Sequence, residues 1–439
     1  MKKILIYTLF SLAIFCGCKK DNSNLIDGER PEDRVNNALI EYNDQLTGSP
    51  YGWKAYLYPD GGGGYSFYLN FDKNNRVKMY ADLDFDPAMT SKESSYRLKA
   101  YQIPTLSFDT YNYMHMLADP DRTVFGGVSG WGHYSDFEFA FDKVSGDTIK
   151  LNGKMLDSKL ILVKATKAEQ DAYNNEELAL SMEDGIDFID ANKYLYLTLG
   201  DQTQIQTSFD YYNKVVSLTW NENGTVNTTS TDFVFTLTGI VLKAPLVYKD
   251  KVISEFLFDG TRYVAVSGAS KVNVLASATP ILPLHLIMGI TYSSIIAPNA
   301  ITYAGWSTDF MSRRAAAATG VAGFNIGGVL LRLDRMTFTF NKTTKVMRAA
   351  VSTPYGTTAL TLNFDYSYVK TDDGVFKFTL GTLGGNEAAL GGVLAPILTQ
   401  RIGADQFTLS YFVNPANGQI LGQFKSVEHP DFYFSGTLQ

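Results

Sequence analysis

Short runs of aromatic and β-branched residues, separated by glycine-rich or polar turns, recur along most of this chain. The first three runs are Trp53–Tyr58, Tyr65–Phe71 and Arg76–Asp82, and the turns Asp60–Gly64 and Asp72–Asn75 lie between them. Tyr and Phe favour strands, and short runs joined by such turns are typical of antiparallel hairpins. Because aromatic residues make up 13% of the sequence, we expect a mainly β protein whose strands follow one another as a meander.

Two helices interrupt this pattern. The first is expected over Asp27–Leu46, because Pro31 suits a first helical turn and apolar residues then recur on one face. The second is expected to begin at Thr166, where Thr166 and Glu169 have the spacing of a capping box, and to continue with a break to about Ala191. Strand-like runs resume afterwards: Tyr194–Leu199, Val215–Trp220, Phe233–Leu237, Tyr263–Val266, Met336–Asn341, Thr343–Val351, Phe364–Val369, Val375–Leu380 and Phe407–Val413.

The chain is too long for one hydrophobic core, since roughly 420 residues follow the leader described below. We expect two or three antiparallel units of sandwich or barrel type, the first two each preceded by a helix. The predicted domains are residues 28–165 and residues 166–439, with a further division of the second near 310–330 as the alternative. In that stretch Arg313–Ala318 predicts a short helix, and glycines up to Gly328 predict a surface loop.

The sequence pattern of one predicted hairpin recurs later in the chain. Phe67–Met79 resembles Phe338–Met347, since both read as an aromatic strand, a polar loop and a second strand. A duplicated unit would explain the likeness. The alternative is that unrelated hairpins share this pattern.

The first 18 residues read as an export signal. Lys2 and Lys3 precede the apolar run Ile4–Phe15, which is too short for a membrane span of about 20 residues. The small residue Gly17 directly before Cys18 resembles a bacterial lipobox, although Phe15 and Cys16 depart from its usual residues. We therefore expect residues 1–17 to be a cleaved signal peptide and Cys18 to carry the lipid; ordinary secretion is the alternative.

The segment after Cys18 is polar, and residues 18–27 are expected to form a lipid-anchored flexible tether. Cleavage removes Cys16, and lipidation consumes Cys18, the one remaining cysteine. The mature protein is therefore expected to have no disulfide, no cysteine-ligated metal and no cysteine nucleophile.

Aromatic residues near Gly126–Gly130 are the best ligand-binding candidates. A flexible loop carrying Tyr111, Tyr113, Trp131 and Tyr134 could present flat apolar rings to a sugar or a peptide. The alternative is that these rings only cover the end of a sheet.

Candidates for metal binding are weaker. His115, His133 and a nearby carboxylate could bind zinc, but their spacing has no metal signature. Asp82, Asp84 and Asp86 would share one face of a strand, where they could bind calcium or protect a sheet edge. We expect edge protection and no resident metal or cofactor.

Catalytic motifs are not found. The sequence has no nucleophile elbow, zinc-protease helix or phosphate-binding loop. Asp136 and Glu138, two positions apart near Trp131, are the acid pair considered for glycoside hydrolysis, although such pairs are common by chance in β proteins. The net charge of −7 and the lack of a basic cluster argue against nucleic acid. We expect no catalytic residues.

A family resemblance is carried by Gly52–Trp53, Tyr65–Phe71, Arg76–Met79, Tyr96–Lys99 and Pro104–Tyr111. With the lipobox, these segments resemble the domain-of-unknown-function family 4302, most clearly over residues 28–180. The resemblance implies a surface lipoprotein of a Gram-negative bacterium with a starch-utilisation-like (Sus-type) uptake system. Such proteins accompany an outer-membrane transporter and its lid lipoprotein, and sometimes a zinc metallohydrolase. The family has no established active site to transfer.

Together, the anchor, the tether, the aromatic residues and the lack of catalytic motifs indicate an accessory binding or assembly subunit for glycan or peptide uptake. We expect it to be lipid-anchored in the outer membrane, at the cell surface rather than on the periplasmic face. The alternatives are a secreted hydrolase acting on a polymer and a purely structural scaffold subunit.

Overall fold

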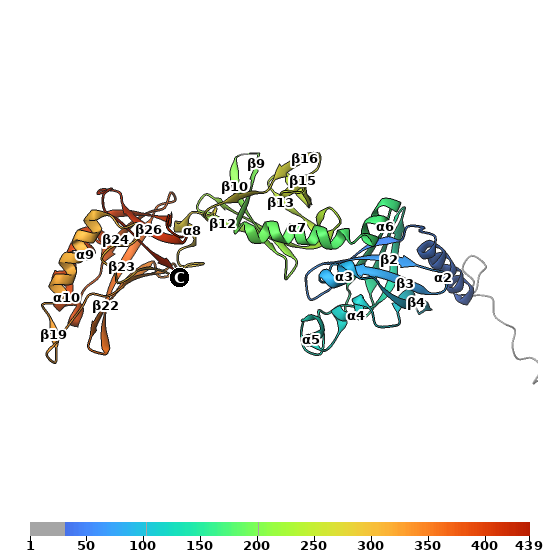
Figure 1. Ribbon diagram of the computed structural model, residues 1–439, viewed down its shortest axis with the longest axis horizontal. Helices are drawn as coiled ribbons and strands as arrows, with labels where there is room; N and C mark the ends of the chain where they lie inside the picture. Colours follow the sequence, from blue (N-terminus) through green and yellow to red (C-terminus); the bar gives the residue numbers. More distant parts are fainter. Residues whose placement is uncertain (1–30, 102, 201) are drawn as a thin grey trace, which may run out of the picture.

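The computed structural model describes residues 31–101, 103–200 and 202–439, so the predicted signal peptide, tether and Cys18 lie outside the described residues. Three β-rich units follow one another in an elongated row: a closed barrel, a nine-stranded sheet and a second closed barrel (Figure 1). Helices precede the first two units. The prediction of a mainly β fold with barrel-like antiparallel units is confirmed, whereas the domain boundaries stay a prediction.

The first barrel has eight strands in sequence order, and the last strand pairs with the first. Along the first strand the buried residues Trp53, Ala55 and Leu57 alternate with more exposed ones, as expected for side chains that point alternately into and out of a barrel. The strands are β1 (Trp53–Tyr58), β2 (Tyr65–Phe71), β3 (Arg76–Ala81), β4 (Lys92–Ala100), β5 (Pro104–Phe108), β6 (Glu138–Ser145), β7 (Thr148–Gly153) and β8 (Lys159–Lys164).

Helix α2 (Pro31–Thr47) packs against the end of this barrel at which β1 begins. Tyr42 stacks on Phe141 with ring centroids 3.9 Å apart, and the indole nitrogen of Trp53 donates a hydrogen bond of 2.9 Å to the carbonyl of Leu46. The predicted apolar face of the first helix is therefore the face that anchors it to the barrel.

Three short helices lie in the barrel's connections: α3 (Phe85–Met89), α4 (Tyr113–Ala118) and α5 (Arg122–Phe125). The first of them corrects the prediction that Asp82, Asp84 and Asp86 share a strand face. Strand β3 ends at Ala81, Asp84 caps α3, and Asp86 lies in its first turn. Asp82 is fully buried and ion-paired with Lys214, so it protects no sheet edge.

The helical segment between the first barrel and the sheet confirms the predicted capping box and break. The hydroxyl of Thr166 accepts a hydrogen bond from the backbone of Glu169, whose side chain accepts one from the backbone of Thr166. Helix α6 (Lys167–Asn174) is followed by α7 (Glu177–Ala191), and Glu176 between them has a φ of 65°. This left-handed residue interrupts the helix.

The nine-stranded sheet is also antiparallel, and α7 packs on its strands β12 and β13. Its edge strands are β16 and β17, so the sheet is open. The strands are β9 (Tyr194–Leu199), β10 (Thr203–Asp210), β11 (Val215–Glu222), β12 (Thr225–Thr236), β13 (Gly239–Tyr248), β14 (Lys251–Phe258), β15 (Tyr263–Ser267), β16 (Ser270–Asn273) and β17 (Leu275–Ser277).

The second barrel repeats the eight-stranded meander. The two hairpins that echo each other in sequence, β2–β3 and β21–β22, occupy the second and third positions of their barrels. The topology is therefore the one that a duplicated unit would have. The strands are β18 (Ser294–Ala297), β21 (Met336–Asn341), β22 (Val346–Tyr355), β23 (Thr358–Lys370), β24 (Val375–Leu380), β25 (Gln406–Val413), β26 (Ile420–Ser426) and β27 (Tyr433–Leu438).

Helices cover one side of the second barrel. A short helix, α8 (Leu284–Ile287), precedes β18, and α9 (Thr308–Val321) packs against α10 (Gly385–Ile397), which ends in a π-helical turn over Leu398–Ile402. The predicted short helix is thus longer at both ends, and the glycine-rich stretch forms a hairpin of β19 (Asn325–Ile326) and β20 (Val329–Leu330).

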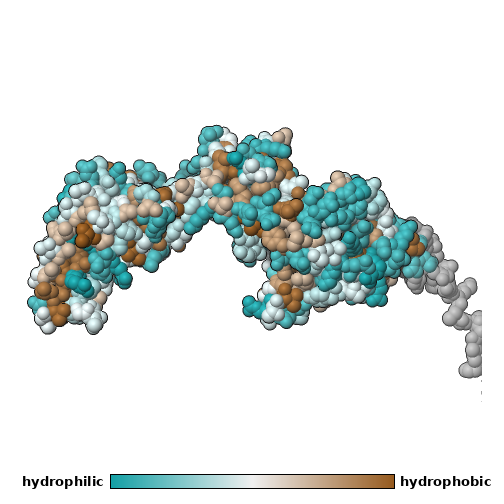
Figure 2. All heavy atoms as spheres, in the orientation of Figure 1, coloured by the Kyte–Doolittle hydropathy of each residue, from teal (hydrophilic) through white to brown (hydrophobic). Residues whose placement is uncertain are grey.

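Apolar side chains gather at this far end of the molecule, over α9, α10 and the hairpin (Figure 2). Val329 and Leu330 are 44% and 59% exposed. Within the part of the chain that the structure describes, no helix has both the length and the apolar character needed to cross a membrane.

Candidate ligand-binding site

The segment between β5 and β6 carries all four predicted aromatic residues and lies at the end of the first barrel opposite to α2. It packs beside the turn after β1, where the backbone N–H of Asp60 donates a 3.2 Å hydrogen bond to the carbonyl of Tyr134. The side chain of Asn112 caps α4, and that of Asp121 caps α5. Two short helices therefore hold the ends of the aromatic loop.

The loop itself is tightly hydrogen-bonded rather than flexible. Val128 and Gly132 form an isolated bridge, and the backbone N–H of His133 donates to the carbonyl of Leu117 at 2.8 Å. Gly132 has a φ of +57°, and a Cβ there would lie 2.6 Å from the carbonyl oxygen of Leu117. Only glycine fits this close approach without strain.

On this loop the exposed ring of Trp131 stacks on the partly buried ring of Tyr134. Their ring centroids are 5.7 Å apart with an interplanar angle of 18°, and Trp131 is 54% exposed. A tryptophan held flat against a second ring has lost much of its rotamer freedom before any ligand arrives. It therefore offers a preformed apolar surface.

Tyr111 belongs to a second stack, in which His115 lies between Tyr111 and Phe137 with centroid distances of 5.6 and 4.6 Å. The hydroxyl of Tyr111 donates a 2.6 Å hydrogen bond to Asp119, and burial together with this carboxylate raises the pKa of Tyr111 to about 12. Tyr111 is 49% exposed. Asp119 directly follows α4, and Leu117 in the last turn of α4 accepts the backbone N–H of His133. Both stacks are therefore fixed to one short segment.

Tyr113 differs from the other three residues because it is buried. Its hydroxyl donates to the carbonyl of Thr90 at 2.8 Å. The structure therefore leaves Tyr111 and Trp131 exposed in two separate ring stacks and places Tyr113 in the core.

The two histidines stabilise the loop. His133 Nε2 lies 2.7 Å from the carbonyl oxygen of Phe125, and Nδ1 lies 3.5 Å from the hydroxyl of Tyr65. His115 Nδ1 lies 2.9 Å from the side-chain oxygen of Asn112. Among the described residues, no three His, Cys, Asp or Glu side chains are grouped as metal ligands.

Asp136 and Glu138, the two carboxylates considered as a catalytic pair, both accept hydrogen bonds that stabilise the fold. Asp136 is buried and accepts backbone hydrogen bonds from Met155, Leu156 and Ser158 at 2.7 to 3.2 Å. Glu138 accepts from Lys99 at 2.6 Å and from Ser107 at 2.9 Å. Burial alone would raise the pKa of Glu138, but the bonds from Lys99 and Ser107 hold it below its ordinary value. Glu138 therefore lacks the raised pKa that a general acid needs.

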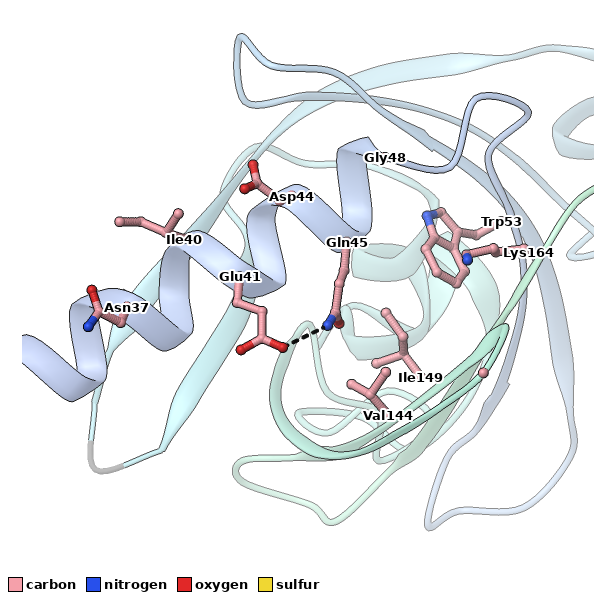
Figure 3. A pocket seen from close by; sticks show the side chains of 11 residues that line it. Asn37, Ile40, Glu41, Asp44, Gln45, Gly48, Trp53, Val144, Ile149 and Lys164 are labelled. Atoms are coloured by element: carbon pink, nitrogen blue, oxygen red, sulfur yellow. Dashed lines mark hydrogen bonds between the residues drawn. The ribbon is translucent and has the colours of Figure 1, made fainter. Parts of the chain in front are cut away.

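A pocket of about 610 Å³ lies at the other end of the first barrel, between α2 and the turn that joins β6 and β7. Glu41 and Gln45 point from α2 toward Val144 and Ile149 of the barrel, and Trp53 lies beside Lys164 at the inner end (Figure 3). This volume is typical of small-molecule sites.

The pocket was not predicted from the sequence. The helix residues that line it, including Asn37, Glu41, Asp44 and Gly48, recur at spacings of three and four, so their shared polar face was visible. The opposing wall comes from residues about a hundred positions later, whose approach depends on barrel closure.

Comparison with known proteins gives a family match and matches to solved structures. The family described as Domain of unknown function (DUF4302) matches residues 28–260, which include the first barrel and strands β9–β14. No curated protein matches the chain at a significant level.

One of the matching solved structures is isotype 1 transferrin binding protein B (TbpB) from serogroup B Neisseria meningitidis. The match covers 88% of this chain and 76% of that one, with 11% sequence identity and a TM-score of 0.14. A likeness at this TM-score supports no inference about the fold or function of the chain.

Proposed function

This chain belongs to the family described as Domain of unknown function (DUF4302), and from that membership we propose that it is an accessory binding subunit of a nutrient-uptake system. Its ligand is a glycan or a peptide that lies across the rings of Trp131, Tyr134 and Tyr111. The observation that carries this proposal is the exposed Trp131–Tyr134 stack on a hydrogen-bonded loop.

Exposed stacked rings support ligand contact because they combine apolar area with little conformational freedom. Sugar rings and peptide side chains both present apolar faces that can lie on such a surface, and burying apolar area contributes about 25 cal/mol per Å². The carboxylate of Asp119, which receives the hydroxyl of Tyr111, provides a polar neighbour. A surface of this kind binds an extended ligand rather than enclosing a small one.

Attachment to a membrane is the second part of the proposal. Acylation of Cys18 after removal of residues 1–17 would tether the first barrel to the outer membrane, with the protein at the cell surface. Two or more acyl chains give far more durable attachment than one. The partners that fit this placement are an outer-membrane transporter and its lid lipoprotein.

Assembly with those partners has its own support. The exposed hairpin of β19 and β20, with Val329 and Leu330, offers apolar area at the end of the molecule remote from α2. The scaffold alternative would use this surface and leave the aromatic loop without a ligand. The hydrolase alternative loses support because Asp136 and Glu138 are both held by structural hydrogen bonds.

Binding of the lipid-free protein to arrays of glycans and peptides tests the proposal. We expect Trp131→Ala to weaken binding by about tenfold or more, since losing a central aromatic contact typically costs at least 1–2 kcal/mol. The matched control is Tyr212→Ala, because Tyr212 is an 82% exposed aromatic residue of the β10–β11 turn. Binding that is equally strong in the wild type and Trp131→Ala would exclude the aromatic surface as the ligand site.

A further inference from the structure

We infer that the pocket between α2 and the first barrel binds an organic ammonium ion, meaning a primary amine on a short aliphatic body. This site is separate from the aromatic surface. Trp53 at the pocket begins β1, whereas the turn that follows β1 packs against the aromatic loop. The inference therefore holds or fails independently of the proposed function.

The donor groups along the inner wall of the pocket already contact acceptors of the protein. Gln45 Nε2 donates to Glu41 at 3.2 Å, and Trp53 Nε1 donates to the carbonyl of Leu46 at 2.9 Å. The ammonium group of Lys164 is paired with Asp147 at 3.0 Å. Each of these three groups has one acceptor within the protein, and the charge of Lys164 is balanced by that of Asp147.

Acceptors, by contrast, remain available. Glu41 and Asp44 are exposed carboxylates on the pocket side of α2, and no described residue forms an ion pair with either of them. Gln45 Oε1 is buried in the wall and receives no hydrogen bond from the described residues. A buried acceptor without a donor costs about 1–3 kcal/mol, and a ligand N–H could remove that cost after a rotation of the Gln45 side chain.

The charge of the site selects an ammonium group over a hydroxyl group. Asp44 lies in the last turn of α2, where the helix dipole has its negative end, and no basic residue occupies that turn. Two carboxylates and the helix end thus attract a cation. An ammonium group also brings three donors, enough to engage Glu41 and Gln45 together.

The opposite wall selects an aliphatic body. Val144 and Ile149 face Glu41 and Gln45 across the pocket, and the ring of Trp53 lies at its inner end (Figure 3). Apolar side chains on one wall and acceptors on the other fit a molecule with one charged end and one branched or linear hydrocarbon end.

The test compares two probes that differ only in the charged group, 3-methylbutylamine and 3-methylbutan-1-ol, titrated into the full mature chain at pH 7. Binding is followed by calorimetry and by the NMR signal of the Trp53 indole N–H. We expect the amine to bind at least about tenfold more tightly than the alcohol, because hydrogen bonds to charged groups are stronger than neutral ones.

Glu41→Gln is the discriminating variant, since glutamine can still accept the hydrogen bond from Gln45 while removing the charge. It should weaken amine binding about tenfold and leave alcohol binding unchanged. Glu222→Gln, at an exposed acid of β11, is the control and should change neither. Equal affinity for the two probes, an unaffected Glu41→Gln variant, or tighter binding of glucose than of the amine would each overturn the inference.

Discussion

Lys214 and Asp82 form a buried ion pair, with 2.9 Å between Nζ and Oδ2, where the nine-stranded sheet meets the first barrel. The same ammonium group donates to the backbone carbonyl of Asp82 at 2.8 Å, and the carboxylate accepts backbone N–H groups from Ser66 and Phe235. One carboxyl group thus links strands β2 and β12 of different units. The residues of this junction all lie within the stretch that the family model matches, residues 28–260.

Breaking this pair should destabilise the protein strongly. Burial raises the pKa of Asp82 and lowers that of Lys214, so each charge is retained only because the other is present. Lys214→Met should lower the free energy of unfolding by about 3–5 kcal/mol, measured by urea denaturation, because it leaves a buried carboxylate unpaired.

The double variant Asp82→Leu with Lys214→Met should recover much of that loss, since no unpaired charge remains. The control is Arg348→Met, which breaks a half-exposed pair with Asp365 and should cost at most about 1 kcal/mol. A Lys214→Met variant that is as stable as Arg348→Met would contradict the role of the junction.

The shape of the aromatic loop should depend on Gly132 more than on Gly130. Both have positive φ, but a Cβ at Gly132 would collide with the carbonyl of Leu117, whereas a Cβ at Gly130 meets nothing within 4 Å. Gly130→Ala should cost only the left-handed strain of about 1–2 kcal/mol and preserve ligand binding. Gly132→Ala should displace Trp131 and weaken glycan or peptide binding as much as Trp131→Ala does. Equal ligand binding by Gly130→Ala and Gly132→Ala would show that binding does not depend on the close approach of Gly132 to Leu117.

Acidification should destabilise the Tyr111–His115–Phe137 stack. Burial is the main cause that lowers the pKa of His115, and the charge of Lys92 adds to it. The unfolded chain therefore takes up a proton before the folded chain does. The stabilising contribution is complete above the ordinary histidine pKa of about 6.5 and is lost as the pH falls through the lower folded value.

Melting temperatures at pH 7.5 and pH 5.0 check this sign. The wild type should lose more stability on acidification than His115→Gln does. An NMR titration in which His115 protonates above about pH 6.5 in the folded protein would refute the expectation.

Local elements could be predicted from this sequence because their signals are local. The capping box at Thr166, the first helix and the hairpins at Phe67–Met79 and Phe338–Met347 depend on neighbouring residues, and they form as expected. Barrel closure could not be predicted, since β8 pairs with β1 and β27 with β18 across long stretches of sequence.

The candidate site residues show the same difference between local signals and long-range contacts. Alternation at Asp82 could not distinguish a strand face from a buried ion pair, because its partner Lys214 is 132 positions away. The aromatic loop was visible as a cluster of rings and glycines, but its hydrogen bonds and the burial of Tyr113 depend on the barrel. The pocket beside α2 could not be predicted, because its two walls come from residues about a hundred positions apart that only barrel closure brings together.

Lipid attachment through Cys18 is the central premise of the proposed function, and metabolic labelling with a radioactive fatty acid tests it directly. Cells producing the wild type or a Cys18→Ser variant are labelled and separated into membrane and soluble fractions. We predict that the wild type is labelled, shortened and found in the outer membrane, and that Cys18→Ser is neither labelled nor cleaved at that site. A variant that stays processed and membrane-bound like the wild type would contradict the anchor and, with it, the proposed place of this protein in nutrient uptake.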